Sequence, residues 1–256
     1  MKNKMNLKRS ILFVLSLTLI LGSSCSNDET DSSVGILNIS AKSSFTKLTN
    51  KSSSAKGMVG DIVIDKFQMN ISKFELEIDL EDENYQDDQN ELWDDDGFYD
   101  YEDEIELMGP FELDLMSGQI SFINVTVPVG NYDELEFKFD VSTDPSSDLF
   151  DKSILIQGTI NGTTPFIFWH NFDDEVEVDF EDAQFDISVT QNAQGIVIDF
   201  DLGQILDSVN GVDLTLATDG NQDGTIEISP EDPDGNNALA EALRNKIKEY
   251  VNLLDD

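Results

Sequence analysis

Strict alternation of apolar and polar residues recurs along the chain and predicts short β-strands. Within 111–115 and 135–141, apolar residues occupy every second position and charged residues fill most of the positions between them. When apolar residues recur at every second position, one side of the strand faces a core and the other side faces water. Because similar segments follow one another with turn residues between them, we expect a mainly β protein with an antiparallel β-sandwich fold. The remaining predicted strands are 35–41, 61–80 (one long strand or two short ones), 120–127, 153–160, 165–172, 175–181, 185–189, 196–202 and 212–217.

The segment 111–141 is the clearest part of this pattern. It reads as three strands, with breaks at Ser117–Gly118 and at Gly130–Asn131. Pro128 ends the middle strand because proline cannot donate a hydrogen bond to a central ladder. A Gly–Asn pair is a hairpin signal, so we expect the second and third strands to form a hairpin there. The Asn161–Gly162 pair likewise predicts a hairpin between 153–160 and 165–172.

One segment, 237–254, has the periodicity of an amphipathic helix. Its cationic residues lie in the second half, where the helix dipole favours positive charge. A C-terminal helix is therefore expected to cover an open face or edge of the sheets. Its apolar stripe consists of Leu239, Leu243, Ile247, Val251 and Leu254.

The N-terminus has the pattern of an export signal. Basic residues precede a short apolar run at 11–21, and small residues then lead to Cys25, the single cysteine of the chain. The arrangement resembles the lipobox of bacterial lipoproteins, which implies that Cys25 is lipidated after removal of residues 1–24. The alternative is an ordinary signal peptide with an incidental cysteine. Residues 26–29 (Ser-Asn-Asp-Glu) resemble an acidic surface-export tag, so we expect an outer-membrane lipoprotein at the cell surface, with the periplasmic face as the alternative.

The strongly negative net charge limits the kinds of molecule that the chain can bind. The formal net charge is −38, and removal of residues 1–24, which contain four basic and no acidic residues, makes it −42. Such a chain repels nucleic acid and anionic headgroups, so we expect no nucleic-acid partner and membrane contact through the lipid anchor only. It attracts cations or basic partners, although solubility in a salty medium explains the composition equally well. A single cysteine also excludes an internal disulfide, so the fold rests on its apolar core.

The composition divides the chain into four parts. Residues 1–24 are the signal, 25–33 a polar tether, 34–217 the β-sandwich, and 218–256 an acidic turn with the terminal helix. The sandwich contains an acidic insertion at about 81–104, whose density of charge is typical of a mobile segment. Its aromatic residues are candidates for stacking on a glycan or docking a surface protein. The predicted ligand-binding residues are Trp93, Tyr99 and Tyr101.

Two motifs resemble a family of bacterial surface lipoproteins that share a domain of unknown function. These are Leu-Asp-Leu-Met-Ser-Gly at 113–118 and Pro-Val-Gly-Asn-Tyr at 128–132. The resemblance covers 34 to about 202 and implies an immunoglobulin- or transthyretin-like sandwich without an established activity. The acidic-proline segment that usually follows the first strand of that family is missing here. The motifs are turn and strand signals, so the resemblance supplies no catalytic residue.

A loop near the C-terminus has the spacing of a calcium-binding loop. Oxygen-bearing residues stand at its first, third and fifth positions, glycine at the sixth and isoleucine at the eighth. Two features depart from the EF-hand: position twelve is Pro230, and a predicted strand precedes the loop. A later carboxylate from Glu231, Asp232 or Asp234 would have to complete the site, and the alternative is a plain acidic turn. The predicted calcium ligands are Asp219, Asn221, Asp223, Thr225, Glu227 and Glu231.

Residue types give little support to catalysis. His170 is the only histidine, and it shares one face of a predicted strand with Phe166 and Phe168, which favours a structural role. The sequence contains no histidine cluster for zinc, no phosphate loop and no G-x-S-x-G elbow. We therefore predict a non-enzymatic binding or adhesion module, stabilised by calcium. The alternatives are an accessory glycan-binding protein and, less favoured, a carboxylate-dependent hydrolase.

Overall fold

A computed structural model describes residues 34–45, 57–59, 61–78, 104–179 and 187–255. Contacts between residues divide the chain into two units, 1–31 and 32–256, and every described residue belongs to the second.

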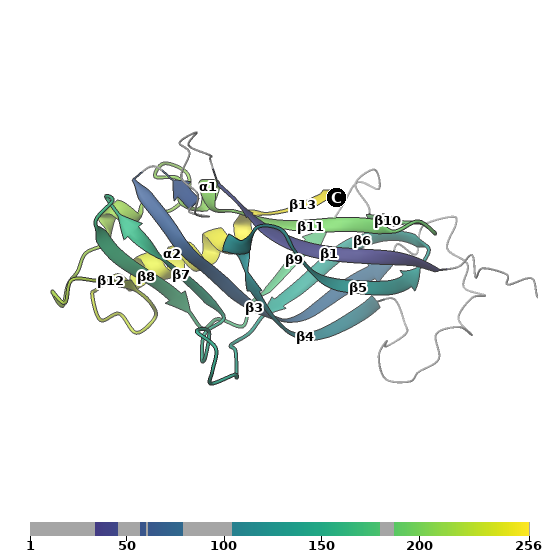
Figure 1. Cartoon of the computed structure of the whole chain (residues 1–256), viewed down its shortest axis with the longest axis horizontal. Helices are drawn as coiled ribbons and strands as arrows, with labels where there is room; N and C mark the ends of the chain where they lie inside the picture. The colour runs from purple at the N-terminus through teal and green to yellow at the C-terminus, as the bar shows by residue number, and fades with distance from the viewer. Residues whose placement is uncertain (1–33, 46–56, 60, 79–103, 180–186, 256) are drawn as a thin grey trace, which may run out of the picture. The chain divides into compact units, whose positions relative to one another are not determined.

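The described residues form mainly β-strands and two α-helices (Figure 1). Two 3-10 turns, Leu115–Ser117 and Leu214–Leu216, join some of these elements. The strands are β1 (Val34–Ser44), β2 (Gly57–Val59), β3 (Ile62–Ile78), β4 (Glu104–Asp114), β5 (Ile120–Pro128), β6 (Gly130–Phe139), β7 (Ile154–Ile160), β8 (Thr164–His170), β9 (Glu175–Asp179), β10 (Ile187–Val189), β11 (Gln194–Asp201), β12 (Ile226–Ile228) and β13 (Val251–Asp255). The helices are α1 (Leu202–Ile205) and α2 (Asn237–Glu249).

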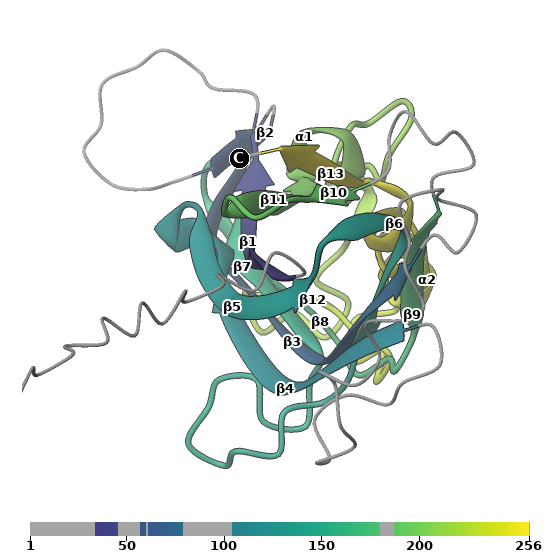
Figure 2. The ribbon, with the colours of Figure 1, turned by 90° about the vertical axis from the view of Figure 1, so that its right-hand side faces the viewer.

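The strands make two sheets that enclose one core, which confirms the predicted mainly β, sandwich-like fold with a C-terminal helix. The smaller sheet has the order β13-β11-β1-β5, and the larger follows β10-β6-β3-β7-β8-β12. The short strand β2 and strand β4 also pair with β3, and β9 pairs with β6. Figure 2 shows β1 and β11 across the interior from β3 and β4. The finer assignment to an immunoglobulin or transthyretin fold stays a prediction.

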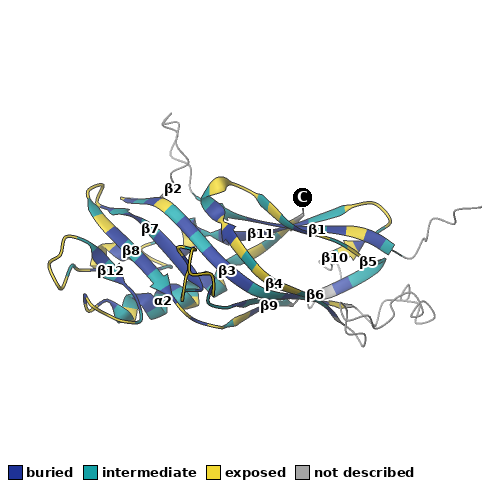
Figure 3. Cartoon of the chain, turned by 60° about the horizontal axis from the view of Figure 1, so that its bottom comes forward, coloured by how far each residue is buried: buried dark blue, intermediate teal, exposed yellow. Residues whose placement is uncertain are grey.

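Aromatic rings from both sheets meet in the core. Phe200 of the smaller sheet makes edge-on contacts with Phe67, Phe137 and Phe139 of the larger sheet, with ring centroids 6.1–6.4 Å apart. All four side chains are buried, and strands such as β6 and β8 alternate between buried and more exposed residues (Figure 3). In these strands the period of two in the sequence therefore identifies the side that faces this core.

Strand β3 organises the larger sheet because it is long enough to change partners. Its first half, 62–69, pairs with β7, and its second half, 71–78, pairs with β6 along the same edge. A register shift between Ile71 and Lys73 follows directly after the change. The sequence pattern left open one long strand or two short ones over 61–80, and the structure has one.

The 111–141 segment is divided between the two sheets. β5 pairs with β1 in the smaller sheet, whereas β4 and β6 both pair with β3 in the larger one. The hairpin predicted at Gly130–Asn131 is therefore wrong, because these residues begin β6 and pair with β10 in the larger sheet, whereas β5 lies in the smaller one. The hairpin predicted at Asn161–Gly162 is confirmed: both residues have positive φ angles, 53° and 73°, and join β7 to β8.

The predicted C-terminal helix ends earlier than its apolar stripe suggests. α2 stops at Glu249, and Val251–Asp255 forms β13, an antiparallel neighbour of β11. Pairing with the edge of β11 satisfies the backbone groups of these five residues outside a helix, so the tertiary partner overrides the local periodicity. Ala240, Leu243 and Ile247 are the buried face of α2, which contacts β8 and β12. No helix among the described residues is long and apolar enough to cross a membrane.

Candidate functional site

The predicted calcium loop lies between the 3-10 turn Leu214–Leu216 and β12, the strand that joins the edge of the larger sheet beside β8. The strand predicted at 212–217 is therefore wrong, because the Asp213 side chain caps a 3-10 turn there by accepting from the Thr215 N–H. Two buried polar residues anchor it from the segment before α2. The Asp234 carboxylate accepts hydrogen bonds from the backbone N–H groups of Asn221 (3.1 Å) and Glu227 (2.6 Å). Asn236 accepts from the Thr218 N–H and donates to the carbonyls of Thr218 and Glu227. The two ends of the loop are thus held together.

Inside the loop, side-chain oxygens at alternate positions accept backbone hydrogen bonds. Asp219 accepts from the N–H of Asp223 (3.1 Å) and of Gly224 (2.9 Å). Asn221 accepts from the Asp223 N–H, and Asp223 accepts from the Thr225 N–H, both at 2.9 Å. Gly224 has φ of +94°, a conformation that favours glycine. The chain therefore winds around oxygens of the three residues whose spacing gave the calcium prediction.

These oxygens retain the capacity to bind a cation. An ionised carboxylate has about four lone-pair sites, and each loop carboxylate oxygen named above accepts one backbone hydrogen bond. Calcium takes carboxylate, amide and carbonyl oxygens in flexible geometries, so Asp219, Asn221 and Asp223 fit as ligands. Asp219 is half-buried, and the other two are exposed, so an ion would reach the loop from solvent.

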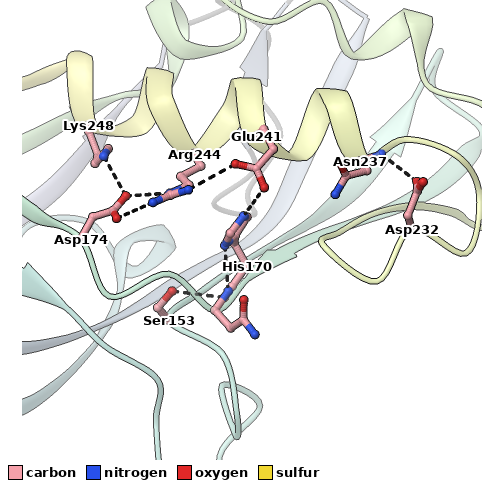
Figure 4. Close-up of polar contacts among 9 residues, drawn as sticks. Ser153, His170, Asp174, Asp232, Asn237, Glu241, Arg244 and Lys248 are labelled. Atoms are coloured by element: carbon pink, nitrogen blue, oxygen red, sulfur yellow. Dashed lines mark hydrogen bonds and ion pairs between the residues drawn. The ribbon is translucent and has the colours of Figure 1, made fainter.

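The other residues that were expected to act as calcium ligands make different contacts or are exposed. Glu227 Oε1 accepts hydrogen bonds from Trp169 Nε1 (3.0 Å) and Ser229 Oγ (2.9 Å). Thr225 uses its N–H within the loop, and Glu231 is exposed. Asp232 Oδ1 accepts from the N–H of Asn237 at the start of α2 (Figure 4). Among the later carboxylates that the sequence offered, Asp234 is the one whose hydrogen bonds close the loop.

A second acidic group lies on the outer face of the larger sheet and was not identified from the sequence. The register of β3 and β6 places Glu75 opposite Glu136 and Glu77 opposite Glu134, and β9 adds Glu177 beside Glu136. One carboxylate oxygen from each of Glu134, Glu136 and Glu177 lies within 4.8 Å of the other two. The glutamates of β3 and β6 line a cavity of about 30 Å³. We call these five residues the acidic face.

Partial burial and the repulsion of neighbouring carboxylates raise the proton affinity of Glu136, the central residue of the acidic face. Partial burial, followed by the charges of Glu75 and Glu175, raises the pKa of Glu136. Lys73 gives partial compensation through ion pairs with Glu75 and Glu106, and Lys138 pairs with Glu175. The sequence showed that Glu134 and Glu136 face outward, but only the register of three strands brings these carboxylates together.

A compact group of paired charges joins α2 to the end of β8 (Figure 4). The Asp174 carboxylate accepts two hydrogen bonds from Arg244, one from Nε at 2.7 Å and one from a terminal guanidinium nitrogen. Lys248 Nζ lies 2.7 Å from Oδ2 of the same carboxylate. These hydrogen bonds from Arg244 and then from Lys248 hold the pKa of Asp174 at about 2. Arg244 also contacts Glu241 at 3.3 Å. We call Asp174, Glu241, Arg244, Lys248 and His170 the helix clamp.

His170 is a structural member of the helix clamp. Its Nδ1 accepts from the Asn171 N–H (3.0 Å), so the neutral ring carries its proton on Nε2, 3.4 Å from Glu241. Burial lowers the pKa of the imidazole, and this effect outweighs the opposing influence of Glu241. The sequence predicted this structural role, and the hydrogen bonds supply its reason.

The other predicted site residues, Cys25, Trp93, Tyr99 and Tyr101, lie outside the described residues. Comparison of the chain with models of known protein families, with curated proteins and with solved structures finds no match.

Proposed function

We propose that the chain is an exported, lipid-anchored binding module of the outer membrane, without enzymatic activity, whose β-sandwich is stabilised by calcium at the Asp219 loop. The observation that carries the calcium part is the winding of this loop around side-chain oxygens of Asp219, Asn221 and Asp223. The loop leads directly into β12 and then α2, so an ion there would hold the edge of the larger sheet.

The proposal as a binding module is supported by the surface that the sandwich presents. Glutamates stand opposite glutamates on the acidic face. Charge of one sign on one face of a sheet attracts cations and basic partners and raises their local concentration. The lipid anchor rests on the apolar run at 11–21 followed by Cys25, and it would keep such a surface at the membrane.

Calcium titration of the purified, chelator-treated chain tests the loop. The absent position-twelve ligand implies a dissociation constant of about 10⁻⁴ to 10⁻³ M. At a hundredfold excess over that constant, binding to the native state alone adds about 2.7 kcal/mol to the free energy of unfolding. Thermal denaturation with calcium, magnesium or sodium at matched ionic strength would measure this gain. Isothermal calorimetry would measure the affinity directly.

Asp223→Ala is the informative variant, with Asp173→Ala as its matched control. Both remove one exposed aspartate, but Asp173 lies between β8 and β9, away from the loop. We expect the Asp223 variant to lose the calorimetric signal of the loop and most of the calcium stabilisation, and the control to keep both. A full response in Asp223→Ala, or equal responses to magnesium, would identify the loop as an acidic turn.

Cys25→Ala tests the anchor separately. The variant is expected to appear in the soluble fraction and to lose incorporation of labelled fatty acid, because a thiol at this position is the acceptor in lipoproteins. Unchanged partition into membranes would contradict the anchor. This result would leave the calcium experiment unaffected, because that experiment uses the soluble chain.

A further inference from the structure

Two buried amide oxygens lie where β3 changes its neighbour from β7 to β6. Gln68 Oε1 and Asn70 Oδ1 receive no hydrogen bond from any described residue. Asn70 is 2% exposed, so water in bulk cannot satisfy its oxygen. A buried acceptor without a donor costs about 1–3 kcal/mol, and such a group in a native protein indicates a bound water or ion.

The orientation of the Asn70 side chain is fixed by its other contacts. Its amide nitrogen donates to the Asp140 carbonyl at 2.9 Å, and its main-chain N–H donates to the Ser153 carbonyl at 2.9 Å. Asp140 and Ser153 are the two ends of the loop between β6 and β7, residues 140–153. Because the nitrogen of the amide must face Asp140, the oxygen is left as the unpaired end.

Strand register brings a carboxylate to the same place. Gln68 and Asn70 are two residues apart and share one side of β3, and Glu112 on β4 is the direct partner of Asn70. Glu112 accepts hydrogen bonds from the hydroxyls of Ser142 and Ser147, the latter at 2.7 Å. The 140–153 loop therefore folds over this side of β3 and β4 and is attached there through Glu112 and Asn70.

The serine protons of this group are already used, and acceptor oxygens remain. Each serine hydroxyl has one proton, and both protons go to Glu112. The lysines of the loop region have other partners, since Lys66 pairs with Asp148 and Lys152 donates to the Phe150 carbonyl. A water could donate to the two amide oxygens, but it would leave the charge of Glu112 uncompensated. A cation satisfies all three groups.

We propose that Gln68 Oε1, Asn70 Oδ1 and the Glu112 carboxylate form a calcium site that holds the 140–153 loop against β3 and β4. Calcium accepts this mixture of neutral amide and charged carboxylate oxygens, with waters for the remaining positions. Magnesium requires near-ideal octahedral geometry and is disfavoured by ligands on a rigid strand. Glu112 is exposed while Asn70 is buried, so the ion has an entry from solvent beside Glu112. This site is separate from the Asp219 loop and does not depend on it.

Calorimetric titration of the chelator-treated Asp223→Ala chain with calcium chloride, and in parallel with magnesium chloride, tests the proposal. The background substitution removes the ion proposed for the Asp219 loop, and the part of the remaining calcium binding that a change at Glu112 weakens belongs to this site. Glu112→Gln keeps the shape and one of the two oxygens that accept from the serines but removes the charge, and we expect calcium binding weaker by about tenfold or more. Glu106→Gln is the matched control on the same strand, and we expect its affinity to be unchanged.

Two more variants keep the test decisive if one of them fails to fold. Asn70→Asp adds a charge at the buried oxygen and is expected to bind calcium more tightly than asparagine, whereas Gln68→Met removes an oxygen at similar length and should bind less tightly. Circular dichroism identifies the folded variants. Hydrogen exchange should show calcium-dependent protection within 140–153 that Glu112→Gln loses. Equal affinities in Glu112→Gln and Glu106→Gln, an equal response to magnesium, or no calcium binding at all would overturn the site and leave a buried water as its occupant.

Discussion

The helix clamp combines carboxylates with cationic residues, whereas the acidic face consists of glutamates alone, and the two regions have opposite electrostatic character. In the helix clamp, Arg244 and Lys248 of α2 lie on one carboxylate, and the pKa of Asp174 falls to about 2. On the acidic face, Glu75 and Glu136 stand directly opposite each other, and the pKa of Glu136 is raised. Ionisation of Asp174 therefore stabilises the helix clamp, whereas ionisation of Glu136 on the acidic face opposes folding.

The comparison shows that the net charge of the chain does not determine whether a given charged residue stabilises or destabilises the fold. A helix can turn its cationic residues toward an acidic loop, whereas neighbouring strands bring residues of the same outward pattern into direct opposition. A like-charge pair across strands is destabilising unless an ion or partner compensates it. Regions of this second kind therefore cost stability when free and are suited to binding cations.

The largest effect is expected from breaking the helix clamp. Asp174→Ala would leave Arg244 and Lys248 together without their acceptor, and we expect a loss of about 2 kcal/mol at pH 7, the range for a hydrogen bond to a charged group. Because the pKa of Asp174 lies below its ordinary 3.8, this contribution is present above pH 4 and is lost as pH falls through about 2. Chemical denaturation measures it, with Asp173→Ala as control; equal losses in both variants would show that the clamp contributes nothing.

A smaller effect of opposite sign is expected on the acidic face. Glu136→Gln should stabilise the calcium-free chain by about 0.5–1 kcal/mol at pH 7 and low salt, because it removes a charge that opposes its neighbours. The raised pKa of Glu136 means that its charged form costs stability as pH rises above 4.5, so the gain should disappear in acid. Sodium chloride should reduce the gain by screening. Destabilisation by Glu136→Gln at low salt, relative to Asp173→Asn, would contradict the repulsion.

The smallest effect concerns the protonation of His170. Burial lowers the pKa of this imidazole below 6.5, so the unfolded chain takes up a proton first as pH falls. Stability should therefore decrease by a few tenths of a kcal/mol from pH 7 to pH 6, and His170→Gln should remove that part of the slope. Denaturation midpoints of both chains at several pH values give the difference. Identical slopes would show that another group titrates.

The alternation of residues was sufficient to predict many strands but not their neighbours. The hairpin at Asn161–Gly162 follows from local turn chemistry, because two residues with positive φ join adjacent strands. The corresponding signal at Gly130–Asn131 gave a wrong prediction of a hairpin, because β5 and β6 belong to different sheets. Val251–Asp255 likewise continues a helical pattern, yet it becomes β13 because the edge of β11 is free to pair with it.

The sequence by itself determined the mainly β class, the outward direction of the acidic residues and the spacing of the Asp219 loop, because periodicity and turn chemistry are local properties. The tertiary structure decided which carboxylates meet: Glu75 with Glu136, Asp174 with Arg244, and Glu112 with Asn70. These contacts join residues about 40 to 70 positions apart, and strand register and helix docking fix them. Those two features depend on how the whole core packs, and no short segment of the chain encodes them.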